Sequence, residues 1–364
     1  LSLVNLTTGT NLNPITLQGI RYLLDYPYGC TEQTTSKLIP LYIYYDIIIE
    51  NELLSKEELD ERISGGLERI YGFQRYDGKW GWWKDSSADK FMTSYAMFGL
   101  YLAKEYGFEV NEGVLKSGYD GLKNFYNYNA DPFVQYVYIL FSKMYGNEVN
   151  GGKAYTGDPA SLALTSLAAY ELGSINQAVE YFDKIWDEID FDDEDTLIFN
   201  TFDYFFDETV TFAFIARAAN MVEQYNTEKN TVMEILKMNQ GGYWGSTAST
   251  AIALTQLDKF SSIFDENTKI TIESDAYTGE NINPNVSLNL IFKPGETLKI
   301  ETDEPIYVSI SKEIPKAFSD MENTSVSDEN IGLLRILRRI ERIPRDGVFV
   351  RTMPQIDSPY IVKD

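Results

Sequence analysis

The residues with the clearest chemical potential are the only cysteine of the chain and a glutamine three positions later. Cys30 and Gln33 end the segment YPYGCTEQ at 26–33. On a turn that opens a helix, side chains at positions i and i+3 share a face, with Cβ atoms about 5–6 Å apart. At that separation the sulfur can attack the amide carbon of Gln33 and expel ammonia. The product is an internal thioester, which stores an acyl group for one covalent capture.

The neighbouring residues are expected to support this reaction. Sulfur attacks as a thiolate, and we expect a helix N-terminus to lower the pKa of the Cys30 thiol. Gly29 is expected to form the tight turn before the helix, and Glu32 to orient the ring or accept a proton. Tyr26 and Tyr28 are expected to keep water away from the bond.

Composition closes several other routes to function. The chain has no histidine, which excludes Ser-His and Cys-His relays and His-ligated metals. One cysteine excludes an intrachain disulfide and a Cys-rich zinc site, so no cofactor and no metal are expected. The formal net charge of −24 opposes binding to nucleic acid or to an anionic membrane surface. No run of about 18 apolar residues is present to span a bilayer.

Most of the chain is predicted to be helical, because apolar residues recur at helical spacing between turns rich in Gly, Asn and Asp. Pro40 is expected to kink or break its helix at the second turn. About eleven helices make five or six hairpins, and helices rich in small residues, such as 161–172 and 246–257, suit the inside of a closed α/α toroid. The expected helices are 14–24, 33–49, 56–73, 90–106, 112–127, 131–146, 159–172, 174–190, 207–224, 227–237 and 246–260.

The pattern changes after Asp258. Short β-branched segments separated by turn residues predict strands at 269–275, 286–293, 297–302 and 305–311. A polar acidic stretch at 319–329 precedes two further strand-like runs at 331–342 and 347–353. The whole chain is therefore expected to be mainly α, with a toroid followed by a smaller, incomplete β region.

Three ordered segments resemble the bacterial alpha-2-macroglobulin family, which is related to complement component three and the insect thioester proteins. They are YPYGCTEQTTSKLIPL at 26–41, GFQRYDGKWGWWKDSSADKFMTSYAMFGL at 72–100 and YWGSTASTAIALTQLDKF at 243–260. The resemblance covers essentially all of 14–260. One departure is Thr31, where the vertebrate members have glycine.

The resemblance implies a domain organisation. Residues 14–260 would be the α/α-toroid thioester domain, inserted in a β domain similar to a CUB module. The strand stub 1–13 and the region 262–312 would be the two parts of that β domain. Residues 313–364 would begin a macroglobulin-like β-sandwich that is cut short.

The same resemblance implies a function. The chain would be part of a non-enzymatic, single-use inhibitor that traps an attacking protease when a lysine amine of that protease attacks the thioester; small amines would react in the same way. The complement proteins use a histidine to pass the acyl group to hydroxyls, and a chain without histidine is expected to acylate amines. A periplasmic or extracellular location, with a membrane tether upstream, is also implied, and no direct membrane contact of this part.

Two other functions remain open from the sequence. The thioester could attach the protein to neighbouring surfaces as an adhesin. A toroid enzyme such as a terpene cyclase needs a central acidic motif, and DFDD at 190–193 fits that pattern, although a solvated acidic loop is the preferred interpretation over this motif or a calcium site. Trp80, Trp82 and Trp83 suit a carbohydrate platform, but we expect them to staple adjacent helices.

Overall fold

The computed structural model describes residues 2–9, 12–26, 29–149, 151–155, 157–191, 197–198, 205–257, 268–283, 286–293, 295–302, 306–313, 330–331 and 334–338. The chain divides into two compact units. One unit is Thr16–Lys259, and the other combines Leu1–Ile15 with Phe260–Asp364. Within the described residues, every helix is too short or too polar to cross a membrane.

The larger unit is built from helices. Their bounds are α1 (Asn13–Asp25), α2 (Thr31–Ile43), α3 (Tyr45–Glu50), α4 (Lys56–Phe73), α5 (Lys90–Glu105), α6 (Glu112–Asn129), α7 (Pro132–Met144), α8 (Pro159–Glu171), α9 (Ile175–Asp183), α10 (Glu208–Met221), α11 (Tyr225–Lys237) and α12 (Thr247–Leu257). A 3₁₀ helix at Lys184–Glu188 follows α9, and a short hairpin pairs β2 (Asp190–Phe191) with β3 (Leu197–Ile198).

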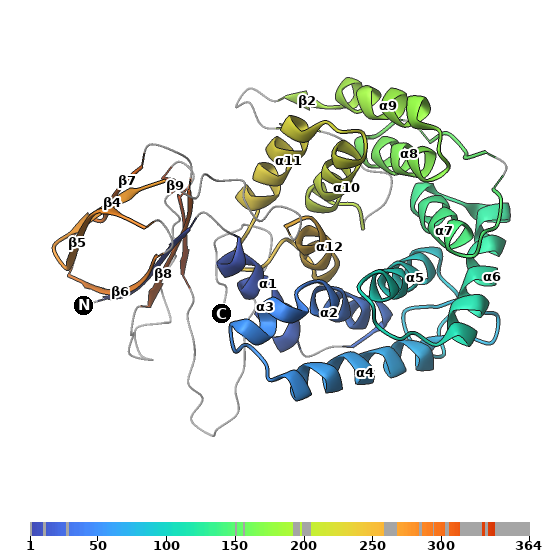
Figure 1. Cartoon of the computed structure of the whole chain (residues 1–364), viewed down its shortest axis with the longest axis horizontal. Helices are drawn as coiled ribbons and strands as arrows, with labels where there is room; N and C mark the ends of the chain where they lie inside the picture. Colours follow the sequence, from blue (N-terminus) through green and yellow to red (C-terminus); the bar gives the residue numbers. More distant parts are fainter. Residues whose placement is uncertain are drawn as a thin grey trace, which may run out of the picture. The chain divides into compact units, whose positions relative to one another are not determined.

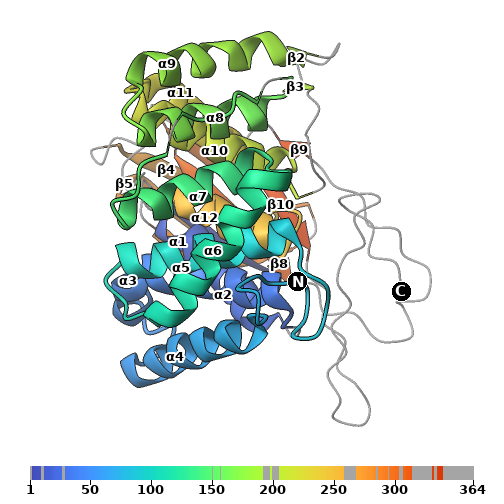
Figure 2. The ribbon, with the colours of Figure 1, turned by 90° about the vertical axis from the view of Figure 1, so that its right-hand side faces the viewer.

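Six helices close into an inner ring (Figure 1). Around it, α2 packs on α5, α5 on α7, α7 on α8, α8 on α10, α10 on α12, and α12 back on α2. The helices α4, α6, α9 and α11 pack outside this ring, and in the perpendicular view the helices lie in layers from α9 at the top to α4 at the bottom (Figure 2). The structure therefore confirms the predicted α/α toroid.

The burial pattern explains which helices lie inside. The inner helix α12 is buried along its whole length, and α5 is buried at every position from Phe91 to Leu100. The outer helix α4 buries only one stripe, formed by Leu59, Ile63, Leu67 and Ile70. Small residues allow the inner helices to approach closely, since a Cβ at Gly99 of α5 would lie 2.6 Å from Cγ2 of Thr35 in α2.

Two tryptophan loops staple outer helices to inner ones in the same way. The indole N–H of Trp80 donates to the carbonyl of Ile70 at 2.8 Å, and that of Trp244 donates to the carbonyl of Ile235 at 2.7 Å. In each loop the glycine two residues earlier has a positive φ, 78° at Gly78 and 91° at Gly242. The geometry that the two loops share agrees with the expectation that Trp80 staples adjacent helices, and Trp80 is fully buried.

The described residues of the second unit form two sheets. One has the strand order β6 (Val286–Phe292), β1 (Ser2–Gly9), β8 (Tyr307–Glu313), β10 (Leu334–Arg338), β9 (Asn330–Ile331), and the other has β5 (Tyr277–Ile282), β4 (Ile270–Ser274), β7 (Lys299–Thr302). Strand β1 pairs antiparallel with both β6 and β8, and β10 pairs parallel with β8. Side chains from both sheets share one core, with Leu6, Ile272 and Leu290 among its members.

Several element boundaries differ from the prediction. Helix α2 continues through Pro40 and ends at Ile43, so the expected break at the second turn is wrong. The interruption falls at Tyr44, whose N–H still donates to the Pro40 carbonyl. The helix predicted over 174–190 ends at Asp183 and gives way to the 3₁₀ turn. Strand β5 was not predicted, because its sequence YTGENI is mostly polar.

Candidate functional site

Cys30 and Gln33 meet at the start of α2. Cys30 is the N-cap of this helix and is only 2% exposed. Its side chain faces the backbone N–H of Gln33, and the Gln33 side-chain Oε1 accepts a hydrogen bond from the Cys30 N–H at 3.2 Å. This reciprocal arrangement is a capping box with sulfur in place of the usual hydroxyl. It holds the thiol and the carboxamide on the same turn.

Burial controls the state of the thiol. Burial raises the pKa of Cys30, while the backbone N–H groups of Gln33 and Glu32 lower it and the Glu32 charge raises it further. The net shift is upward. The expectation that the helix N-terminus would lower this pKa is therefore wrong, because desolvation of the thiolate outweighs the N–H groups. The sulfur rests as a protonated thiol at neutral pH.

Thr31 fastens this turn to the first tryptophan loop. Its N–H donates to the carbonyl of Trp82 at 3.0 Å, and its hydroxyl donates to the carbonyl of Gly81 at 2.6 Å. Thr31 is fully buried. Both hydrogen-bond donors of the residue that follows Cys30 thus bind one neighbouring loop, while its carbonyl accepts from the Thr35 hydroxyl at 2.8 Å.

Glu32 fastens the same turn on the other side. Its Oε1 accepts hydrogen bonds from Ser36 and from Thr247 at the start of α12, both at 2.7 Å. Burial raises the pKa of Glu32, and the two hydroxyls only partly oppose this. The carboxyl therefore joins the first and last inner helices of the ring.

Gly29 leaves room for the Arg69 side chain next to Cys30. Its carbonyl accepts hydrogen bonds from Nε and Nη2 of Arg69, at 3.2 and 2.8 Å. A Cβ on Gly29 would lie 2.8 Å from the same Nη2. Its backbone lies outside the left-handed region. The structure therefore gives a steric reason for glycine at position 29, namely the nearby Arg69 side chain, and shows no unusual φ there.

The predicted tyrosine shield is described only in part. The ring of Tyr26 packs on Tyr22 at 6.1 Å between centroids, and Tyr22 packs on Tyr243 at 4.9 Å. The Tyr26 carbonyl accepts a hydrogen bond from Lys37. Tyr28 lies outside the described residues. Protection of the bond by these two tyrosines stays a prediction.

A second aromatic group was missed by the sequence analysis. The ring of Trp82 lies 5.6 Å from that of Phe205, and Phe205 stacks on Phe91 at 3.8 Å with an interplanar angle of 7°. Trp82 belongs to the loop that accepts hydrogen bonds from Thr31, so this aromatic group starts beside the residue that follows Cys30. Phe205 comes from a distant part of the chain and gave no local signal. Trp82 and Trp83 are exposed by 41% and 52%, unlike the staple Trp80.

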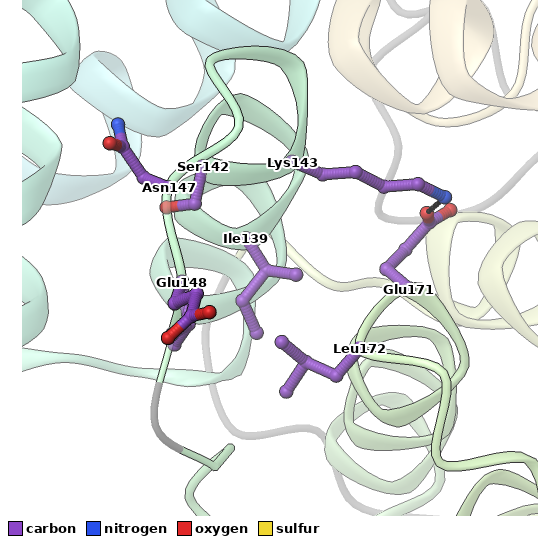
Figure 3. Close-up of a pocket in the computed structure, with 8 residues that line it drawn as sticks. Ile139, Ser142, Lys143, Asn147, Glu148, Glu171 and Leu172 are labelled. Carbon is purple, nitrogen blue, oxygen red and sulfur yellow. Dashed lines mark hydrogen bonds and ion pairs between the residues drawn. The ribbon is translucent and has the colours of Figure 1, made fainter.

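Other candidate sites lie elsewhere. Most of the acidic run at 190–195, including Asp192 and Asp193 of the cyclase-like motif, lies outside the described residues. In the part of the chain that the structure describes, no group of three or more Cys, Asp or Glu side chains is arranged to hold a metal. A surface pocket of about 310 Å³ lies between the C-terminal ends of α7 and α8, where Lys143 donates to Glu171 at 2.7 Å (Figure 3). None of the residues around Cys30 lines it.

A toroid with a cysteine at the start of an inner helix is the arrangement expected of a thioester domain, and the comparisons with known proteins point the same way. The family model of the A-macroglobulin TED domain matches residues 2–120. The alpha-2-macroglobulin of Thermotoga maritima is 28% identical over 247 residues, which cover 67% of this chain and 14% of that protein. The alpha-2-macroglobulin of Escherichia coli is 27% identical over 191 residues, covering 47% of this chain and 11% of that protein.

Solved structures show the same fold. The native conformation of E. coli alpha-2-macroglobulin superposes with a TM-score of 0.63 at 18% identity, covering 90% of this chain and 22% of that one. Salmonella alpha-2-macroglobulin reacted with methylamine gives 0.60 at 16% identity, with the same coverage of 90% and 22%. Together, the family-model match and the curated relatives support a fragment similar to the bacterial alpha-2-macroglobulin family. The chain spans about one seventh of the length of the T. maritima relative.

Proposed function

We propose that Cys30 and Gln33 form an internal thioester through which this domain covalently captures an attacking protease, as an inhibitor and not as an enzyme. The observation that supports it is the reciprocal capping of the two residues at the start of α2. In forming the bond, the sulfur attacks Cδ of Gln33, the S–C bond forms and the C–N bond breaks. The thiol proton leaves with the amide nitrogen, as ammonia.

Capture reverses the acyl transfer with a new nucleophile. An amine attacks Cδ, a new amide bond forms at Gln33, and the S–C bond breaks to release the Cys30 sulfur, which takes up the proton of the amine. Lysine side chains of a protease and small amines both supply such a nitrogen. The absence of histidine supports amines over hydroxyls as targets, because no imidazole is available to pass the acyl group on.

The relatives support these partners. Among proteins of similar fold, Salmonella alpha-2-macroglobulin was reacted with methylamine and E. coli alpha-2-macroglobulin was activated by porcine elastase. For this chain, protease capture, a periplasmic or extracellular location, and the assignment of 1–13 and 262–312 to a CUB-like domain and of 313–364 to a further sandwich belong to the same proposal.

Peptide mapping by mass spectrometry tests the thioester directly. Freshly purified protein should be one ammonia lighter than its sequence mass, and methylamine should convert Gln33 to its N-methyl amide while freeing the Cys30 thiol. A Cys30→Ser variant is the control and should do neither. A glutamate at position 33 would show that a bond had formed and hydrolysed. An unmodified Gln33 with a free thiol from the first purification step onward would exclude the thioester in this protein.

The same preparation separates inhibition from adhesion. A trap should label a protease that has been added to the full-length protein, at Gln33. Labelling of amine-rich surfaces with no protease present would favour the adhesin alternative instead.

A further inference from the structure

The two tryptophan loops differ by one insertion. In the second loop only Gly245 separates Trp244 from Ser246, whose hydroxyl caps α12 by accepting from the Ser249 N–H at 3.0 Å. In the first loop, residues 81–88 separate Trp80 from Asp89, the cap of α5. The staple itself is complete in both loops, so these additional residues are not needed to join the helices.

The inserted residues contact the reactive turn. Gly81 and Trp82 supply the two carbonyls that accept hydrogen bonds from Thr31, at 2.6 and 3.0 Å. The Trp82 ring continues this contact onto Phe205. The segment that the second loop lacks is therefore the segment bound to the residue next to Cys30.

The insertion is also a built structure rather than a loose loop. The Ser86 N–H donates to the Trp83 carbonyl at 3.0 Å, and the Trp83 N–H donates to the Ser86 hydroxyl at 2.9 Å. Arg75 donates to the Ser86 carbonyl at 2.7 Å. A Cβ on Gly81 would lie 2.2 Å from the Ser87 carbonyl oxygen, so the turn is tightly closed. Such bracing fixes where Trp82 lies.

We propose that residues 81–88 form a cover over the thioester turn, and that Thr31 is the positioning residue that fastens this cover beside Cys30 and Gln33. This inference rests on the proposed function. A thioester survives only if water and amines are kept from its acyl carbon. The Trp82 ring packs at a tilt against Phe205 and is 41% exposed, so it shields the turn from outside yet can be displaced. The Thr31 hydroxyl adds a second bond to the cover, beside the one that its backbone N–H makes.

The alternative is a buried threonine that only satisfies its own hydroxyl. Both interpretations predict some loss of stability when the hydroxyl is removed, but only a cover predicts a faster reaction of the bond. Thr165 is a matched control. It is a buried threonine of the inner helix α8, and its hydroxyl donates to the carbonyl of Tyr155, a loop residue, at 3.2 Å.

The experiment compares the rates of thioester loss in water and in methylamine for wild type and four variants, with the melting temperature of each. Thr31→Val should accelerate both reactions by about fivefold, as expected for a lost hydrogen bond that holds the cover, and Thr31→Ser should keep the wild-type rates. Thr165→Val should lower the melting temperature without changing either rate. Trp82→Ala leaves the Thr31 bonds to the backbone in place and should accelerate both reactions.

The outcomes distinguish the two proposals. If wild type retains an unmodified Gln33, the proposed function fails before the cover is tested. If wild type forms the thioester and Thr31→Val and Trp82→Ala both react at wild-type rates, the cover is overturned and the thioester stands. Should Thr31→Val fail to fold, Trp82→Ala decides alone, because it does not alter α2.

Discussion

The first turns of the inner helices α2 and α8 occupy equivalent places in the ring but are built differently. Helix α8 begins with Asp158, which is 7% exposed and accepts a hydrogen bond from the Ser161 N–H at 2.8 Å. Helix α2 begins with Cys30, which is 2% exposed and caps with sulfur. Aspartate is also the cap of three other inner helices, at Asp89, Asp131 and Asp207. Cys30 therefore stands where the fold otherwise places a capping carboxylate.

The exchange of oxygen for sulfur has a structural consequence. Sulfur is a weak acceptor, so Cys30 caps its helix less well than Asp158 does. Helix α8 continues with Pro159 and Ala160, whose side chains form no hydrogen bonds. Helix α2 continues with Thr31 and Glu32, which bind its first turn to the loop before α5 and to α12. The neighbours thus hold in place a turn that its own cap holds weakly.

The largest expected effect comes from giving α2 an ordinary cap. Cys30→Ser should abolish methylamine incorporation at Gln33 completely, because an alcohol is not activated at this site. Stability should rise by about 0.5–1 kcal/mol, since serine is a strong N-cap. Peptide mapping and urea unfolding measure the two effects. The reference for stability is wild type already cleaved by methylamine, so that both proteins lack the cross-link; a less stable serine variant would contradict the comparison.

Removing the aspartate cap of α8 should lower stability and leave the thioester reaction unchanged. Asp158→Ala should lower the free energy of unfolding by about 0.5–2 kcal/mol, the range for a lost aspartate cap. The thioester should form and react at wild-type rates, because α8 packs on α7 and α10 in the ring rather than on α2. Asp158→Asn is the control and should recover most of the stability. Loss of thioester formation in the alanine variant would show that the two turns are not independent.

Glu32 should make the free energy of unfolding depend on pH. Helix α8 has no such group at the corresponding position, which is Ala160. Burial raises the pKa of Glu32 above its usual 4.5. The folded state then keeps a proton over a pH range in which the unfolded chain has lost it, so this residue reduces the free energy of unfolding as pH rises from about 4.5 through its folded pKa. Glu32→Gln keeps an acceptor for Ser36 and Thr247. Its stability relative to wild type should increase across that range.

An exposed glutamate provides the opposite sign in the same experiment. Hydrogen bonds from Ser55 lower the pKa of Glu58, so Glu58→Gln should lose stability relative to wild type as pH rises through that residue's titration. Urea unfolding at a series of pH values measures both slopes. Parallel slopes for the two variants would contradict the assignment of burial as the cause at Glu32.

Much of this structure could be predicted from local patterns in the sequence. The helix predicted at 56–73 is α4 with the same bounds, because Ser55 and Glu58 form a capping box that can be identified from the sequence. The pairing of Cys30 with Gln33 was likewise predictable, since both lie on one turn. Whether they form a thioester stays a prediction.

The features that could not be predicted depend on contacts between helices that are distant in the sequence and meet only in the closed toroid. Glu32 and Thr247 are separated by 215 positions, and only the packing of α12 on α2 brings them together. The pKa of Cys30 was given the wrong direction for the same reason. A helix N-terminus is a local feature, whereas burial comes from the neighbours in the ring.

The last comparison concerns the residue before each cap, where the smallest change is expected at Gly29. Gly157, before Asp158, has φ of 104° with no atom within 4 Å of an added Cβ, whereas Gly29, before Cys30, lacks a positive φ and faces Arg69. Gly157→Ala should therefore cost about 1–2 kcal/mol of stability through backbone strain. Gly29→Ala should change it by less than about 0.5 kcal/mol, because Arg69 is exposed and its flexible end can move while alanine reduces the entropy of the unfolded chain. Thermal unfolding of the two variants side by side measures the difference; a larger loss at Gly29 would mean that the Arg69 bonds to its carbonyl contribute more to holding the reactive turn than exposed hydrogen bonds usually do.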